Sequence, residues 1–308
     1  MSKHPSLLEQ FRSFYLQNNP KNMEDAIKYF SVFGGIGWRI DTDKPLEELI
    51  ESKIYKNYTY IHNDITKITD SDKIKHALLS GVATGDSRSH SAFKRARISR
   101  ADGENALDLL CDSGIVELEH SLEEALDDDS FASHRVNFMA PFVRFWFSSV
   151  SPFFQGIKEG DYKEASQSFL NREYNFYEHI FQKLSLELVK KEFSDDPIVE
   201  IGSYWDKNVT IDILAKTRSG KTVAGICKYA KVKAKKSELT KLKEQCLLAK
   251  LTPDICIVVS KSGFSNELKS LKSDETRLYA LKSFRTLVEN LSQEDIVTTM
   301  FTKKLAIL

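Results

Sequence analysis

The sequence predicts a mixed α/β protein whose N-terminal half is helical and whose C-terminal half contains a sheet. Three patterns indicate this: helical spacing of apolar residues through 7–112, a strand–turn–strand pattern at 210–228, and a helix followed by the buried apolar run DICIVVS. A helix between two strands implies that they pair in parallel. Because 308 residues exceed one ordinary core, we expect two domains, residues 1–130 and 131–308.

The composition excludes several classes of protein. The 44 basic and 44 acidic residues cancel, so any attraction to nucleic acid must be local. The four cysteines are widely spaced and form no C-x-x-C pair, which predicts reduced, buried thiols. No charged-then-apolar leader and no apolar run of roughly 20 residues is present, so we expect a cytoplasmic protein outside the membrane.

Residues 1–70 show helical patterns separated by polar loops. Leu46, Leu49 and Ile50 are expected to point inward. The segment FGGIGW lacks the glycine spacing and the Gly-Lys-Ser/Thr ending of a phosphate loop. We therefore predict a turn in which Trp38 packs on the preceding helix.

Residues 71–120 predict a winged helix. A helix capped by Asp70 or Ser71 precedes the short basic helix SAFKRARIS and a third helix that Gly114 can end in a left-handed conformation. Val116 and Leu118 then share one face of a half-buried strand, as at the base of a wing. The acidic residues within 119–130 predict a solvated wing or linker.

The basic residues of this region have no acid between them and can contact phosphates. They are Arg88, Lys94, Arg95, Arg97 and Arg100. The alternative is a solvated helix face. The third helix carries Asp102, Glu104, Asp108 and Asp112, which disfavour a phosphate backbone and favour a protein contact.

The stretch FMAPFVRFWFSSVSPFF, residues 138–154, is dense in aromatic rings. Phe142, Phe145, Trp146 and Phe147 are more typical of a core than of a platform for base stacking. Two helices are then expected, YKEASQSFL and FYEHIFQKLSLELVKKEF, with Glu178 off the apolar stripe of the second.

Two strands carry an isolated acid and an isolated lysine. In TIDILA, alternation places Ile211 and Ile213 on one face and Asp212 on the other. The residues of TVAGICKY that share a face are Thr222, Ala224, Ile226 and Lys228. The Ser-Gly signal between the two runs predicts a hairpin.

The order of these segments resembles a known family. The aromatic stretch, the helix with Glu178, GSYWD, IDILA and GICKY resemble the PD-(D/E)XK nuclease-like C-terminal domain of archaeal-type AAA+ ATPases, in which a winged helix precedes it. The resemblance covers roughly the last three-quarters of the chain, without the ATPase domain. It implies an N-terminal helical and winged-helix region followed by a restriction-endonuclease-like α/β domain.

The resemblance also implies site residues. Glu178 matches the first-helix glutamate, Asp212 the central aspartate and Lys228 the lysine of the E-x-K pattern. Ile226 stands where the family has a glutamate, and Thr210 where it usually has another. Because Mg²⁺ needs oxygen ligands, we expect a weak or absent metal at Asp212, completed by Glu178 or Glu200 if the protein is an enzyme.

The lysine-rich segment that follows the second strand is the stronger basic patch. Its lysines nearest the strand are Lys231, Lys233, Lys235 and Lys236, which we expect to contact phosphates unless they form only a solvated face. The sequence thus predicts a DNA-binding protein with a degenerate nuclease-like domain, working with a separately encoded ATPase. The alternatives are an active Mg²⁺-dependent DNA endonuclease and a protein-interaction module without DNA binding. The oligomeric state stays open.

Overall fold

The computed structural model describes residues 4–122 and 134–305, which form two compact units. Within the described residues, unit 1 comprises 4–119, 134–177 and 290–305, and unit 2 comprises 120–122 and 178–289. The chain is of the predicted mixed α/β class. The predicted domain boundary after residue 130 stays a prediction. Both compact units are discontinuous in sequence.

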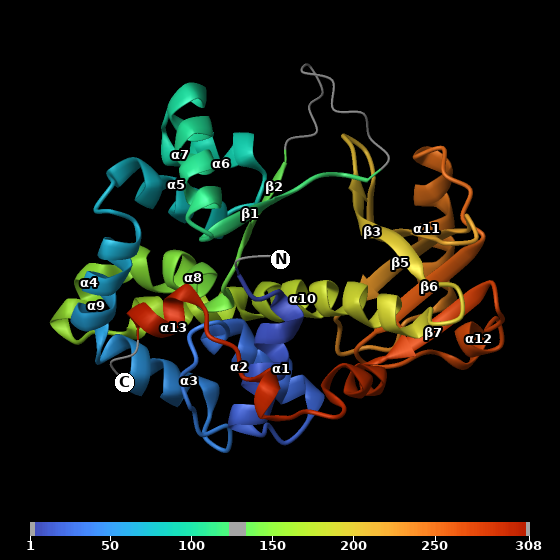
Figure 1. Ribbon diagram of the computed structural model, residues 1–308, viewed down its shortest axis with the longest axis horizontal. Coiled ribbons are helices and arrows are strands. Elements are labelled where there is room, and N and C mark those ends of the chain that lie inside the picture. The colour runs from blue at the N-terminus through green and yellow to red at the C-terminus, as the bar shows by residue number, and fades with distance from the viewer. Residues whose placement is uncertain (1–3, 123–133, 306–308) are drawn as a thin grey trace. The chain divides into compact units, whose positions relative to one another are not determined.

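Unit 1 begins with a group of helices (Figure 1). They are α1 (Leu7–Asn18), α2 (Met23–Phe33), α3 (Leu46–Leu49), a π-helix at Ile50–Tyr55 and α4 (Tyr58–Ile68). Ser6 and Glu9 form a capping box that fixes the start of α1. The FGGIGW segment is a turn, as predicted: Trp38 is buried and its ring centre lies 6.4 Å from that of Phe33 in α2.

Three further helices and a two-stranded sheet follow in unit 1. They are α5 (Lys73–Ala83), α6 (Ser89–Ala96), α7 (Arg100–Asp112), β1 (Val116–Glu119) and β2 (Arg135–Phe138). The strands pair antiparallel, and Arg88 before α6 makes a bridge to Arg135. Asp72, rather than the predicted Asp70 or Ser71, caps α5, because its side chain accepts two main-chain N–H groups. Most of the predicted acidic linker lies outside the described residues.

The aromatic stretch forms the core of unit 1. It comprises α8 (Pro141–Phe145), a π-helix at Trp146–Val150, a 3₁₀ turn at Ser151–Phe153 and α9 (Phe154–Glu159). The rings predicted to be core are fully buried: Phe142, Phe145, Trp146 and Phe147. The C-terminal segment, with the 3₁₀ turn Gln293–Asp295 and α13 (Met300–Lys304), returns to this unit, where Trp38 Nε1 donates to the Leu305 carbonyl at 2.8 Å.

The two helices predicted after the aromatic stretch are one. Helix α10 (Lys163–Glu192) runs for 30 residues without a break, through the segment NREYN that separates the two predicted helices. Its first half belongs to unit 1 and its second half, from Glu178, to unit 2. No helix in the described part of the chain is both long and apolar enough to cross a bilayer.

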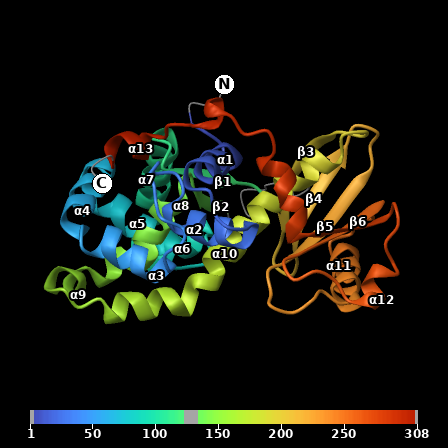
Figure 2. The same cartoon turned by 90° about the horizontal axis from the view of Figure 1, so that it is seen from below.

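Unit 2 is a five-stranded sheet with helices on it. Its strands, in spatial order, are β3 (Ile198–Trp205), β4 (Thr210–Thr217), β5 (Thr222–Lys228), β6 (Ile255–Ser260) and β7 (Thr276–Ala280). Neighbours pair antiparallel from β3 to β5 and parallel from β5 to β7, so the predicted hairpin and parallel crossover are confirmed. Helix α11 (Lys236–Leu248) makes the crossover and covers one face of the sheet (Figure 2). Helix α12 (Asn266–Lys269) and the 3₁₀ helix Leu281–Val288 complete the unit.

A β-bulge in β4 corrects the predicted alternation. Leu214 pairs with Gly202 and Ile211 with Tyr204, so Asp212 and Ile213 together oppose the single residue Ser203. As a result Ile211 and Leu214 both join the apolar cluster under α11. Asp212 and Ile213, which were expected on opposite faces, both leave that face.

Candidate functional site

Asp212 is held at the point where β4 and β5 stop pairing. The last pair of the two strands in this direction is Ile213 with Gly225, and β5 continues beyond it only with β6. The Cys227 main-chain N–H donates to Asp212 Oδ2 at 2.8 Å. Gln182 Nε2, on α10, donates to Asp212 Oδ1 at 3.3 Å. The half-buried carboxylate therefore faces α10 and replaces a carbonyl of the ladder as acceptor.

Glu178 lies next to this carboxylate. It precedes Gln182 by one helical turn, so both side chains leave α10 on the side that faces Asp212. Partial desolvation raises the pKa of Glu178, and the negative charge of Asp212 raises it further. The structure thus brings two of the predicted site residues, Glu178 and Asp212, close enough to repel each other.

The Cys227 thiol completes this polar cluster. Burial raises its pKa well above the usual value, the negative charges of Asp212 and Glu178 add to the rise, and a hydrogen bond with Ser185 opposes it. A thiol in such surroundings keeps its proton at neutral pH and is inert as a nucleophile. Cys227 therefore contributes structure rather than covalent chemistry.

Lys228 lies on the other face of the sheet. It shares that face with Ile226, as predicted, and its Nζ forms an ion pair with the Glu238 carboxylate in the first turn of α11. Ile226 is buried against the apolar side of α11, whose Leu239 and Leu242 belong to the same cluster. Lys228 and Asp212 therefore contact different helices, and the acid beside Lys228 is Glu238.

Glu238 did not emerge from the sequence. One sequence signal could have pointed to Glu238. It is an acid in the first turn of the helix that follows the GICKY strand, on the side from which α11 meets the sheet. Glu200, expected to substitute for the missing acid, lies on the edge strand β3 and pairs in register with Lys216 of β4. It is exposed, and its partner Lys216 lies four residues along β4 from Asp212, which is about 13 Å at the usual strand rise.

These residues do not form a centre for the Mg²⁺ that activity would require. The described residues contain no group of three or more histidine, cysteine, aspartate or glutamate side chains that could hold a metal ion. Asp212 and Glu178 are the two carboxylates that converge, and both oxygens of Asp212 already accept hydrogen bonds.

The lysine-rich segment between β5 and α11 is pinned to the rest of unit 2. Ser262 Oγ donates to the Ala230 carbonyl at 2.5 Å, and the Ala234 N–H donates to the Gly263 carbonyl at 2.9 Å. The lysines between and beside these anchors are exposed, namely Lys231, Lys233 and Lys235. In the described part of unit 2, the ion pairs near this segment fall on Lys228 and Lys236, not on these three lysines.

The predicted basic residues of unit 1 are more often neutralised. Arg100 pairs with Glu104 at 2.6 Å, and Arg95 lies 3.8 Å from Asp86 and donates to the Gly81 carbonyl. Arg88 is half-buried, whereas Lys94 and Arg97 are exposed on and just after α6. The side chains that stay available to a ligand in this region are therefore fewer than the sequence suggested.

Comparison with known proteins identifies one segment. Residues 146–240, less than half of the chain, match the family DUF234, described as archaeal and bacterial proteins of unknown function. The match extends from the aromatic core through α10 and the β3–β5 strands to the start of α11, so it includes Glu178, Asp212 and Lys228. No curated protein and no solved structure matches the chain.

Ile226 tests how far this site tolerates an acid. We expect Ile226→Glu to lower the free energy of unfolding by about 2 to 4 kcal/mol, because a carboxylate would enter the apolar cluster under α11. Ile226→Leu, the control, should cost less than about 1.5 kcal/mol. Thermal unfolding followed by circular dichroism measures both. Equal stability of the two variants would show that the position opens to solvent and can host an acid.

Asp212→Asn tests the repulsion between the two carboxylates. The amide oxygen still accepts the Cys227 N–H, but the negative charge is gone, so the pKa of Glu178 should fall while desolvation keeps it above its usual value. A ¹³C NMR titration of the glutamate carboxyls, assigned with Glu178→Gln, measures the shift. An unchanged pKa in Asp212→Asn would mean that desolvation alone raises it.

Proposed function

We propose that this chain is a DNA-binding protein whose nuclease-like domain has lost its metal chemistry. The observation that carries the proposal is the pinned segment with Lys231, Lys233 and Lys235 exposed and without ion pairs in the described structure. Because hydrogen bonds already fix the main chain of this segment, presenting its charges to phosphates costs less ordering than in a free loop. Lys236, which pairs with Glu267 at 3.6 Å, would join once DNA competes for it.

Two observations favour a degenerate site over an active one. Ile226 occupies the position of the family's second acid, and its side chain is buried in an apolar cluster rather than beside Asp212. The Asp212 carboxylate accepts a hydrogen bond from the Cys227 main-chain N–H, which has no main-chain acceptor on β4 at this point of the described sheet. Glu178 beside Asp212 favours the second candidate, a Mg²⁺-dependent endonuclease, because a cation would relieve the repulsion that raises the pKa of Glu178.

The element order in unit 1 supports the winged-helix part of the proposal. Helix, bridge, two helices and two strands follow one another in the order α5, Arg88, α6, α7, β1 and β2, with Arg88 pairing to β2. Lys94 and Arg97 would supply its phosphate contacts. A separately encoded ATPase would be the partner in trans, which is an implication of the family resemblance alone.

Salt dependence of DNA binding tests the lysine segment. We expect Lys231→Ala, Lys233→Ala and Lys235→Ala together to weaken duplex binding and to flatten the slope of log K against log salt by about 2 to 3, since each lost phosphate contact removes roughly 0.9. Fluorescence anisotropy of a labelled duplex measures the slope.

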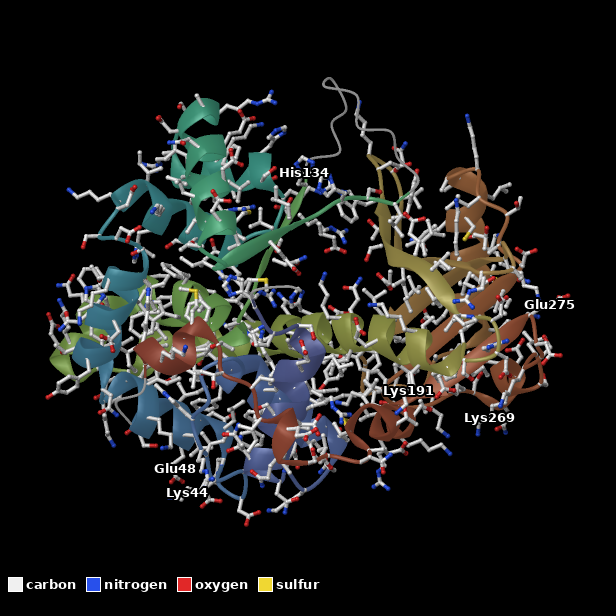
Figure 3. The ribbon with its side chains drawn as sticks, viewed as in Figure 1. Lys44, Glu48, His134, Lys191, Lys269 and Glu275 are labelled. Carbon is white, nitrogen blue, oxygen red and sulfur yellow. The ribbon has the colours of Figure 1, made fainter. Side chains whose placement is uncertain are left out.

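The matched control for this triple variant removes three exposed lysines elsewhere in unit 2: Lys269, which Figure 3 labels, Lys272 and Lys282. It changes the net charge equally and should leave the slope nearly unchanged. Equal effects of the two triples would assign binding to net charge alone and contradict the lysine segment as the contact.

Cleavage assays separate the two candidate functions. With plasmid and single-stranded DNA in Mg²⁺ or Mn²⁺, we expect no cuts, together with a gel shift in EDTA. Asp212→Asn is the proper variant because it keeps an acceptor for Cys227. Metal-dependent cuts that this variant abolishes would establish the endonuclease. The absence of both cuts and shift would leave the protein-interaction module.

A further inference from the structure

The outer face of α11 exposes two adjacent leucines. Leu247 and Leu248 are 77% and 68% exposed, the highest values among the large apolar side chains that the structure describes. Leu239, Leu242 and Cys246 on the opposite side of the helix are buried against the sheet. Because these three residues fix the rotation of α11, the leucines cannot turn inward and stay in water unless a partner covers them.

Lysines outnumber acids around this leucine pair: Lys241, Lys243 and Lys250 stand against the exposed Glu244, which precedes Leu247 by three residues and Leu248 by four. Lys243 precedes Leu247 by one helical turn, and Lys250 follows it by three residues, while Lys241 lies nearly two turns before the pair. All three lysines are exposed. The net positive charge of this face favours a partner that offers an apolar side chain flanked by acids.

Helix α7 of unit 1 has that composition. Its buried side is formed by Gly103, Ala106, Leu107 and Leu110. Its outer side exposes Leu109, at 45%, between the exposed acids Asp108 and Asp112. Neither of these acids has an ion pair in the described residues, whereas Glu104 further up the helix is already paired with Arg100.

We propose that α11 of one copy of this chain docks on α7 of a second copy. Both helices have 13 residues, and the net positive charge around Leu247 and Leu248 complements the acids beside Leu109. The formal net charge of zero means that copies do not repel one another as whole molecules. The contact joins two different faces, α11 of one copy and α7 of the other. Two copies can therefore make the contact twice around a two-fold axis, or successive copies can make it once each in an open chain.

This contact is independent of the proposed DNA binding. It uses Lys241, Lys243 and Lys250 of α11 and its end, and not the pinned segment with Lys231, Lys233 and Lys235. A variant that abolishes self-association can therefore keep its affinity for DNA, and the reverse.

Sedimentation velocity of the full chain across a range of concentrations tests the proposal. In low salt the mean mass should rise with concentration, and in high salt the rise should weaken because flanking charges are screened. Leu247→Ser with Leu248→Ser should weaken association about tenfold or more, since two buried leucines are lost. Val199→Ser is the control, because Val199 is exposed to 63% on β3 but belongs to neither helix.

Charge exchange identifies the pair of faces. Asp108→Lys with Asp112→Lys should abolish association, and so should Lys243→Glu with Lys250→Glu; an equal mixture of the two variants should restore it, because each supplies a face complementary to the other. Circular dichroism verifies that every variant is folded. A monomer at every concentration and salt, or association that persists in both variants, would overturn the proposal.

Discussion

The hydrogen bond from the Cys227 main-chain N–H to the Asp212 carboxylate is the interaction on which this end of the sheet depends. Strand β5 follows β6 to Lys228 but leaves β4 after Gly225, so an N–H that faces β4 needs another acceptor. The bulge at Asp212 and Ile213 turns the carboxylate toward that N–H. A buried amide without an acceptor costs about 1 to 3 kcal/mol, which makes Asp212 valuable to the fold irrespective of chemistry.

The same arrangement divides the polar residues between two faces. Asp212, Glu178 and the Cys227 thiol gather on the α10 face, whereas Lys228 pairs with Glu238 on the α11 face. Lys228 thereby has Glu238 as its partner and Asp212 has two hydrogen-bond donors, while Ile226 fills the apolar space beside Lys228. In sequence, Asp212 and Lys228 resemble a catalytic pair. In the structure, Asp212 accepts a main-chain N–H of β5, whereas Lys228 pairs with an acid of α11.

The periodicity of apolar residues predicted which side chains are buried, but it did not predict the bulge in β4 or the rotation of α11 on the sheet. Burial follows spacing, so the aromatic core, the parallel crossover and the shared face of Ile226 and Lys228 were predictable. One extra residue in β4 adds no composition signal, so Ile213 was placed on the wrong face. The role of Glu238 depends on how α11 is rotated on the sheet, which only the packing of its leucines decides.

The net charge of the chain also gave no indication of a binding surface, because positive and negative side chains are concentrated on different elements. The zero balance conceals lysines concentrated between Lys231 and Lys250 and the exposed acids Asp108 and Asp112 on the outer face of α7. Local pairing then decides which charges can act: Arg95 and Arg100 have carboxylates beside them, Asp86 and Glu104, whereas in the described residues the lysines of the pinned segment have no ion pair. An external phosphate gains most where no protein carboxylate must first be displaced, so unit 2, rather than the helices of unit 1, is the stronger place for the proposed DNA contact.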